Sequence, residues 1–401
     1  MLGAGLMGDA FVLAQLRTPR GKGSSRGALA GVAPTELVRQ LLVALGERGL
    51  APDAVDDVVL GCASQLDAQG GNLARAAALA AGFAPRAGGT MVNRFCASGL
   101  EAIAMAAARV RCGDAQVVIA GGVESVSQVP LFADRGPWWQ AGVGRLHMGV
   151  AADLAATLDG TTRAELDAYA ASTRARARAA AAAGRLAAWT LPVRAADGTV
   201  TLAHDELGDY APTAAELAAL PPAFAALGAD GQDALALAHV PGQMAIRHDH
   251  TRATSPPLAD AAAVLVIGDR AAADRLGLTP LARVVTAASV GADPVAMLTA
   301  GQDAIVHALA RAQLTVDDLA VVEFAEAFAA LCVRLGRQLC LGADRLNPDG
   351  GTLALGHAFG ATGAILAGNV VAHLARTGGR YGVAAVSGAA GVGSAVVLER
   401  C

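Results

Sequence analysis

The feature of this sequence that most restricts its fold is an order of elements that occurs twice. Apolar residues at helical spacing run from Leu37 to Leu45, a turn follows, and Val58–Leu60 has the composition of a short buried strand. The same order returns as a helix over Ile305–Leu309, a turn over residues 314–318 and a strand over Leu319–Val322. Such self-similarity is typical of an internal duplication, so we expect two similar halves.

The two copies stay in step along the chain. Val59 and Cys96 are 37 residues apart, Val322 and His357 are 35 residues apart, and each span ends where a glycine-rich helix is expected to begin. Cys96-Ala97-Ser98-Gly99 in one copy matches His357-Ala358-Phe359-Gly360 in the other, and a buried strand follows each helix, at Gln116–Ala120 and Val383–Val386. We therefore expect Cys96 and His357 to occupy equivalent places, with both helix N-termini at one central pocket.

Between about residues 123 and 254 the repeated pattern stops. This stretch contains a long helical pattern over Arg163–Leu186, and a buried strand over Asp260–Ile267 then closes the first copy. We expect an N-terminal half over residues 1–270 that includes an inserted loop domain at about 123–254, and a C-terminal half over residues 271–401. Since 54% of the residues are hydrophobic, the chain can bury a large α/β core.

Charge and composition exclude several classes of protein. A formal net charge of -4 argues against a general nucleic-acid binder. No apolar run reaches the roughly 18 residues of a membrane helix and no signal-peptide pattern is present, so we expect a cytoplasmic protein. Residues Gly3–Gly8 match a dinucleotide-binding glycine pattern, but no strand precedes them, so we expect no nicotinamide site.

Cys96 has the surroundings of a nucleophile. Most of the six cysteines are expected to be inert core thiols, but a helix N-terminus carries partial positive charge and free N–H groups, which would lower the pKa of Cys96 and provide an oxyanion site. His357 from the twin helix could take the thiol proton and polarise a thioester carbonyl.

Metal and phosphate binding are weaker alternatives. No second pair of ligands lies at liganding spacing around Cys96 or His357, so we expect no metal. His248 and His250 could chelate weakly, although a polar loop is the more ordinary interpretation. A group of arginines on the long predicted helix could face phosphates, although a solvated helical face is the favoured interpretation: Arg174, Arg176, Arg178 and Arg185.

The motifs in this order resemble the thiolase family over nearly the whole chain, from about Phe11 to Arg400. The resemblance is carried by Arg17-Thr18-Pro19-Arg20-Gly21-Lys22, Val92–Leu100 around Cys96, Ala120–Ser125, His147-Met148-Gly149 and Gly350–His357. It implies a five-layered αβαβα fold of two βαβαβ halves, a homodimer or dimer of dimers, and ping-pong chemistry through an acyl-cysteine. The reaction would be thiolysis of a 3-ketoacyl-CoA or the reverse Claisen condensation, with coenzyme A as substrate and no other cofactor.

The resemblance also implies site residues. The catalytic positions are Cys96, His357, Ser387, Ala325 and the backbone N–H of Ala389; the positions that contact the CoA substrate are His147, Met148, Ser255 and Phe328. The sequence departs from the family at Ser387, where the family has a catalytic cysteine, and at Ala325, where it has an asparagine that holds a water. Ala358 and Pro256 are further departures, in the histidine loop and in the segment that contacts the pantetheine arm.

Three functions therefore remain open at this point. The first is a working thiolase in which Ser387 or a water replaces the lost acid/base, a serine hydroxyl being a poorer proton acceptor than a thiolate. The second is a thiolase-like enzyme with impaired carbon-bond chemistry that acts as an acyl transferase, slow hydrolase or different lyase. The third is a CoA-ester binding subunit that acts through a partner. The acyl chain length and the direction of the reaction are left undetermined.

Overall fold

Two half-sheets with the same strand pairing form the centre of the molecule. The computed structural model describes residues 8–131, 133–134, 136 and 146–401, so Gly3–Met7 of the N-terminal glycine pattern lie outside it. The N-terminal half-sheet has the order β1-β8-β5-β3-β4 and the C-terminal one the order β9-β12-β11-β10. Their bounds are β1 Phe11–Arg17, β3 Asp57–Gly61, β4 Thr90–Val92, β5 Val117–Glu124, β8 Ala259–Gly268, β9 Ala282–Gly291, β10 Leu319–Phe324, β11 Tyr381–Ser387 and β12 Val392–Arg400.

The strand directions confirm the duplication predicted from the sequence. β1 with β8 and β8 with β5 are antiparallel, while β5 with β3 is parallel. β9 with β12 and β12 with β11 are likewise antiparallel, while β11 with β10 is parallel. A short antiparallel contact between β1 and β9, over Phe11–Val12 and Ala282–Arg283, joins the halves side by side.

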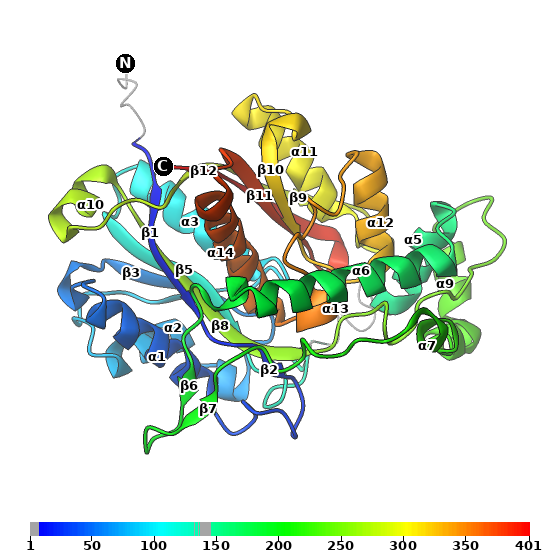
Figure 1. Ribbon diagram of the computed structural model, residues 1–401, viewed down its shortest axis with the longest axis horizontal. Coiled ribbons are helices and arrows are strands. Elements are labelled where there is room, and N and C mark those ends of the chain that lie inside the picture. The colour runs from blue at the N-terminus through cyan, green and yellow to red at the C-terminus, as the bar shows by residue number, and fades with distance from the viewer. Residues whose placement is uncertain (1–7, 132, 135, 137–145) are drawn as a thin grey trace.

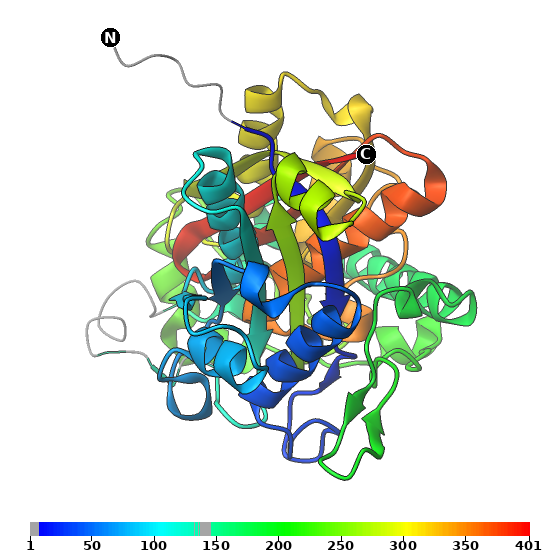
Figure 2. The ribbon, with the colours of Figure 1, turned by 90° about the vertical axis from the view of Figure 1, so that its left-hand side faces the viewer.

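The helices complete five layers around these strands (Figures 1 and 2). α3 (Ser98–Arg111) and α14 (Phe359–Thr377) pack on one another in the middle. The outer face of the N-terminal half is covered by α1 (Pro34–Glu47) and α2 (Leu73–Ala80), which lie in front of its strands in Figure 2. The outer face of the C-terminal half is covered by α11 (Ala300–Ala312) and α12 (Ala329–Gln338). The αβαβα arrangement expected from the resemblance is thus confirmed.

Glycines allow the two central helices to approach at backbone distance. A Cβ added to Gly99 would lie 2.6 Å from the carbonyl oxygen of Gly360, and one added to Gly363 would lie 2.6 Å from the backbone nitrogen of Leu100. α14 is buried on most of its faces, as is typical of a helix with apolar residues all round. The glycine-rich starts noted in the sequence are therefore packing contacts that bring the two helix N-termini together.

The segment between β5 and β8 crosses the C-terminal half. It contains α5 (Met148–Leu158), α6 (Arg163–Ala182), a hairpin of β6 (Val193–Arg194) and β7 (Val200–Leu202), α7 (Ala214–Ala218), α8 (Ala225–Leu227) and α9 (Asp233–Leu237). In Figure 1 the long α6 runs across the front of the molecule, and α5 and α6 pack on α12. The predicted helix over Arg163–Leu186 is confirmed up to Ala182, where the chain turns at Gly184 with a φ of +69°.

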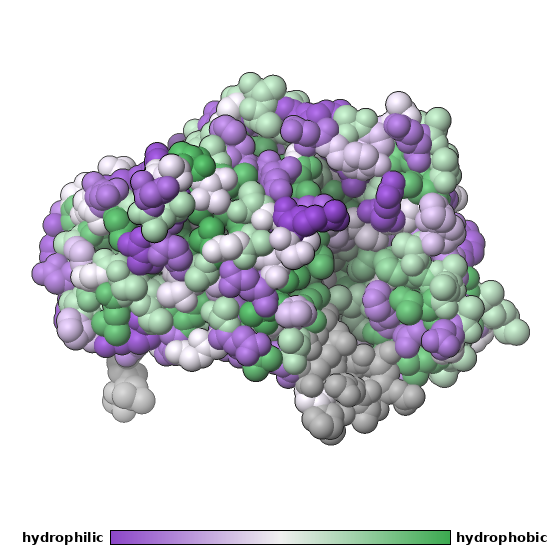
Figure 3. Space-filling view, turned by 90° about the horizontal axis from the view of Figure 1, so that it is seen from below, coloured by the Kyte–Doolittle hydropathy of each residue, from purple (hydrophilic) through white to green (hydrophobic). Residues whose placement is uncertain are grey.

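The surface shows how the hydrophobic residues are distributed outside the core. On the face drawn in Figure 3, hydrophilic residues are spread among hydrophobic ones. Over the described part of the chain, no helix is both long enough and apolar enough to cross a membrane.

Candidate functional site

A cavity of about 230 Å³ lies where the N-termini of the two central helices meet. Of the residues predicted for the site, only Ala325 lies outside its lining, because that side chain is buried in the core below the cavity. The other predicted residues are brought together: Cys96, His357, Ser387 and Ala389, with His147, Met148, Ser255 and Phe328. The remaining lining residues are Leu131, Phe224, Pro256, Leu258, Leu298, Ala327, Phe359 and Gly388.

The loop before α3 is held in a strained shape that places Cys96 at the cavity. Phe95 has a φ of +51°, a conformation that costs a bulky residue about 1–3 kcal/mol. Ser98 stabilises it, because its hydroxyl donates to the Phe95 carbonyl at 2.6 Å and accepts from the Arg94 N–H at 2.8 Å. Asn93 adds an acceptor for the Phe95 N–H at 2.9 Å. Cys96 therefore occupies a rigid turn two residues before the first residue of the helix.

The thiol of Cys96 is a weak acid in this environment. Burial and the charge of Glu124 raise its pKa to about 12, while hydrogen bonds from the backbone N–H groups of Cys96 and Ala389 act in the opposite direction. The prediction of a lowered pKa is therefore wrong for the free protein, since desolvation outweighs the helix N-terminus. The backbone N–H groups of Cys96 and Ala389, which were predicted as oxyanion donors, nevertheless both point at the sulfur.

His357 lines the same cavity as this thiol. Its Nδ1 lies 2.8 Å from the Thr362 hydroxyl, and its buried Nε2 has no hydrogen-bond partner among the described residues. Burial and then the charge of Arg20 lower its pKa to about 3, so the ring is neutral. A hydrogen bond donated from Nδ1 to Thr362 leaves the lone pair on Nε2. The backbone is held by a bond from the His357 N–H to the Pro257 carbonyl at 2.9 Å.

Glu124, at the end of β5, ties the two halves together beneath the site. Its carboxylate accepts hydrogen bonds from the N–H groups of Ala63 at 2.8 Å and Ser64 at 3.2 Å in the N-terminal half, and from Gly360 at 2.9 Å at the start of α14. Burial raises the pKa of this carboxyl, and these backbone donors oppose that effect. Glu124 thus holds the histidine helix against the loop that follows β3.

Ser387, at the position where the resemblance implies a cysteine, is bonded to the first turn of α11. Its hydroxyl oxygen accepts the Gly301 N–H at 2.9 Å. Gly301 is the second residue of α11, so this N–H belongs to the helix end with partial positive charge. The hydroxyl keeps its own proton as a donor, and Ser387 lines the cavity with Cys96 and His357.

Several side chains of the site were not predicted from the sequence. Phe224 comes from the inserted segment, and its ring packs 5.5 Å from His147 and 5.9 Å from Phe328 between ring centroids. The sequence signal for it was weak, because no periodicity surrounds it. Among the residues that were predicted, the buried hydroxyl of Ser255 has no hydrogen-bond partner in the described part of the chain. It is a polar group in the cavity wall that can bond to a bound amide.

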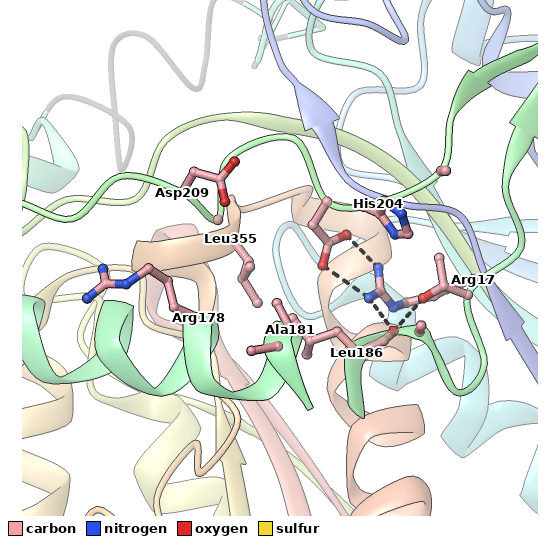
Figure 4. A pocket seen from close by; sticks show the side chains of 13 residues that line it. Arg17, Arg178, Ala181, Leu186, His204, Asp209 and Leu355 are labelled. Atoms are coloured by element: carbon pink, nitrogen blue, oxygen red, sulfur yellow. Dashed lines mark hydrogen bonds and ion pairs between the residues drawn. The ribbon is translucent and has the colours of Figure 1, made fainter. Parts of the chain in front are cut away.

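A second cavity, of about 420 Å³, lies between the C-terminal part of α6 and residues 203–209 (Figure 4). Arg17 lies at one end of it, bound by both carboxylate oxygens of Asp205 at 2.7 and 3.1 Å. Arg178 lies at the other end and is partly exposed. No cysteine lines this cavity among the described residues, so it lacks the nucleophile that the first cavity contains.

The other arginines of the long predicted helix make contacts within the protein. Arg174 is only 4% exposed and donates to the carbonyl groups of Ala170 and Ala253, both at 2.8 Å. Arg176 donates to the Asn347 carbonyl, and Arg185 pairs with Asp349 at 2.7 Å. A shared solvated face, the interpretation favoured from the sequence, is therefore wrong for Arg174.

The described residues contain no group of three or more histidine, cysteine or acidic residues arranged to hold an ion. His248 and His250 both bond to the buried carboxylate of Asp153, each through Nδ1 at 2.8 Å. The two histidines therefore belong to a hydrogen-bonded cluster, and the polar loop expected from the sequence is folded into the protein.

Comparison with known proteins agrees with this geometry. The model of the thiolase N-terminal domain matches residues 10–230, and that of the thiolase C-terminal domain matches residues 278–400. The chain is 34% identical to a beta-ketoadipyl-CoA thiolase of Escherichia coli and 34% identical to a 3-ketoacyl-CoA thiolase of Vibrio cholerae, in each case over 98% of this chain and 100% of the relative. It is 35% identical to a beta-ketothiolase of Cupriavidus necator over 94% of this chain and 96% of the relative.

Proposed function

Because the chain belongs to the thiolase family, we propose that Cys96 is the residue that carries its acyl intermediate, with His357 as the base. The protein is an acyl-CoA acyltransferase of the thiolase type, acting by thiolysis of a 3-ketoacyl-CoA or by the reverse condensation. The observation that carries the residue assignment is the shared cavity. There, two backbone N–H groups point at the Cys96 sulfur, and the Nε2 of His357 is buried without a partner.

The first half of the reaction follows from the neutral starting state of the pair. With a thiol pKa of about 12 and an imidazole pKa of about 3, the proton does not leave Cys96 before attack. It moves to Nε2 of His357 while the sulfur bonds to C3 of the ketoacyl group. The oxyanion that forms at C3 is stabilised by the N–H groups of Cys96 and Ala389.

Cleavage of the bond between C2 and C3 then leaves the acyl group on Cys96. C2 takes a proton and departs as acetyl-CoA; Ser387 donates that proton and recovers one from the His357 imidazolium. Free CoA next attacks the acyl-cysteine, its thiol proton passing through His357 to the Cys96 sulfur as the new acyl-CoA leaves. The bond from the Gly301 N–H supports this role, because it stabilises the serine oxygen when it has given up its proton.

The walls of the cavity favour a neutral acyl chain. Aromatic and aliphatic side chains line it: Leu131, Phe224, Leu298, Phe328 and Phe359. Transfer of a carboxylate into such surroundings is unfavourable unless it is paired. We therefore expect acetoacetyl-CoA to be a better substrate than 3-oxoadipyl-CoA, which carries a terminal carboxylate. Equal kcat/KM values for the two substrates would contradict this expectation.

Assembly, location and cofactor use complete the proposal by analogy with the family. We propose a homodimer or dimer of dimers in the cytoplasm that uses coenzyme A as substrate, with no other cofactor. His147, Met148, Ser255 and Phe328 would contact the CoA substrate, the free hydroxyl of Ser255 bonding to an amide of the pantetheine arm.

The experiment separates acylation from carbon-bond cleavage. The purified protein is incubated with acetyl-CoA and the mass of the peptide that contains Cys96 is measured, while thiolysis of acetoacetyl-CoA is assayed in parallel. Both an acetyl adduct on Cys96 and thiolysis are expected. Acylation without thiolysis would restrict the enzyme to acyl transfer, and the absence of both would refute the assignment.

A further inference from the structure

His248 links three segments that wall the acyl-CoA cavity. Its Nδ1 lies 2.8 Å from the Oδ2 of Asp153 on α5, and its Nε2 lies 3.0 Å from the Oδ2 of Asp233 on α9. The side chain is only 13% exposed, and Gly228 lies so close that an added Cβ would meet the ring at 2.4 Å. The imidazole is thus fixed between two carboxylates from different helices.

An imidazole in this position must carry two protons to satisfy both neighbours. Each carboxylate is an acceptor, and a neutral imidazole has only one N–H to donate. The protonated ring donates to both Asp153 and Asp233, whereas the neutral ring leaves one of the two contacts without a hydrogen. In the protonated form both contacts also join a positive ring to a negative carboxylate, which makes them stronger.

Each contact leads to a residue of the cavity wall. α5, which carries Asp153, begins directly after His147. Asp233 is the first residue of α9, the last in a run of short helices that begins directly after Phe224. The other carboxylate oxygen of Asp153, Oδ1, lies 2.8 Å from Nδ1 of His250. The ring of His250 lies 5.5 Å from that of Phe328, measured between ring centroids. His147, Phe224 and Phe328 form one packed group in the wall.

We propose that protonated His248 is a positioning residue that holds this aromatic wall in place for the acyl-CoA, and that loss of its proton loosens the wall. The proposal rests on the assignment of the cavity to the acyl thioester. His248 is not among the residues that line the cavity, so it acts through Phe224 and His147.

The charges around His248 favour the protonated form. Burial alone would lower its pKa, but the hydrogen bonds and charges of Asp233 and Asp153 outweigh that effect and raise the pKa above the ordinary 6.5. In its own segment of irregular chain, Arg247 and Asp249 pair with one another at 3.4 Å, and His250 faces Asp153. His248 with its two contacts to Asp153 and Asp233 is called the clamp. Because the folded-state pKa of His248 is raised, the clamp is complete below the ordinary pKa and is lost as pH rises through the raised value.

Two measurements that need no ligand test the clamp in the full-length protein. NMR titration of the His248 ring should give a pKa above 6.5, which Asp233→Asn lowers. Hydrogen exchange of residues 224–237, corrected for its intrinsic pH dependence, should be faster at pH 9 than at pH 6 in the unmodified protein and fast at both in Asp233→Asn. A His248 pKa at or below 6.5, or exchange rates that change neither with pH nor with the substitution, would overturn the proposal.

Binding of acetyl-CoA tests the link to the cavity. In a Cys96→Ser background, which blocks acyl transfer, calorimetry should show a Kd that is about fivefold higher at pH 9 than at pH 6, the scale expected when one of the two hydrogen bonds of the ring is lost. Asp233→Asn and His248→Gln should bind weakly at both pH values. Asp230→Asn is the matched control, because this exposed aspartate lies on the same run of helices, and it should keep the pH dependence.

The outcomes distinguish the two proposals. If Cys96 cannot be acylated and acetyl-CoA does not bind at either pH, the proposed function fails, while the NMR and exchange results still decide the clamp. If acetyl-CoA binds with the same pH dependence in Asp233→Asn as in the parent, the clamp does not position the wall and this inference is refuted.

Discussion

The starts of α3 and α14 are equivalent in backbone position and opposite in chemistry. Cys96 and His357 each lie two residues before the first residue of their helix, Ser98 and Phe359. Burial makes the thiol a weaker acid and the imidazole a weaker base, so both are neutral at rest. What separates them is their neighbours: two N–H groups at the sulfur, and a threonine hydroxyl at Nδ1 of the ring.

This difference shows what a duplicated fold supplies. Two copies of one helix start place two side chains at a single pocket, and the local hydrogen bonds suit one to the proposed nucleophile and the other to the proposed base. Because the Cys96 thiol and the His357 imidazole are both neutral, no unpaired charge is buried before the substrate binds. Proton transfer and attack must then occur together.

Removing the sulfur should have the largest effect on this pair. Cys96→Ser is expected to lower thiolysis of acetoacetyl-CoA by at least about 10,000-fold, because the acyl-cysteine can no longer form. The steady-state rate and the mass of the intact protein after exposure to acetyl-CoA are the measurements. Cys112→Ser, at the other end of α3, is the control and should keep the activity. An acyl adduct that persists without Cys96 would contradict the assignment.

Removing the base should have the next largest effect and should change the pH dependence. His357→Asn is expected to lower kcat at pH 7 about 1,000-fold, within the range for loss of a general base. Because the pKa of the Cys96 thiol is about 12, the residual rate should climb steadily between pH 7 and pH 10 as thiolate forms. His373→Asn, further along α14, serves as control. A residual rate that does not change with pH would argue against a neutral thiol.

Restoring the family side chains should increase the activity. Ser387→Cys combined with Ala325→Asn is expected to raise the rate of carbon-bond cleavage about 100-fold, since a thiol exchanges a proton with carbon more readily than a hydroxyl does. Acyl exchange between Cys96 and CoA does not involve these positions and should stay unchanged. Separate assays of thiolysis and of labelled-CoA exchange give the two rates. An equal change in both would mean that the substitutions act on binding.

Loosening the imidazole should have the smallest effect. Thr362→Val keeps the shape of the side chain but removes the acceptor at 2.8 Å from Nδ1, and kcat is expected to fall about tenfold. Thr377→Val, at the far end of the same helix, provides the control for a lost hydroxyl. If both substitutions lowered kcat equally, Thr362 would have no special role in orienting the ring.

Much of this arrangement could be predicted from the sequence because it depends on regular periodicity. The repeated helix and strand patterns around Val59 and Val322 predicted equivalent halves, and the glycine-rich starts predicted where Cys96 and His357 would meet. Local patterns could not predict the pKa of the thiol. The direction in which this pKa shifts depends on burial and on Glu124, which lies 28 residues away in the sequence.

The parts of the site that were missed come from irregular chain. Phe224 follows two prolines in a stretch without periodicity, so nothing in the sequence predicted that its ring would pack on Phe328. Thr362 lies on a helix that is buried on most of its faces, so the sequence does not indicate which of its residues contacts His357. The contact depends on the turn before the helix, which places the His357 ring beside the Thr362 hydroxyl. Such contacts depend on tertiary packing, which a single sequence does not record.

The carboxylate of Glu124 has a consequence for the order in which the protein matures. Two of its backbone donors belong to the N-terminal half and one belongs to the first turn of α14. A nascent chain that has released only its N-terminal half lacks the third donor, so the carboxylate is better solvated by water than enclosed. Closure of the pocket is therefore coupled to synthesis of the C-terminal half, and an incomplete chain does not present a finished acylation site.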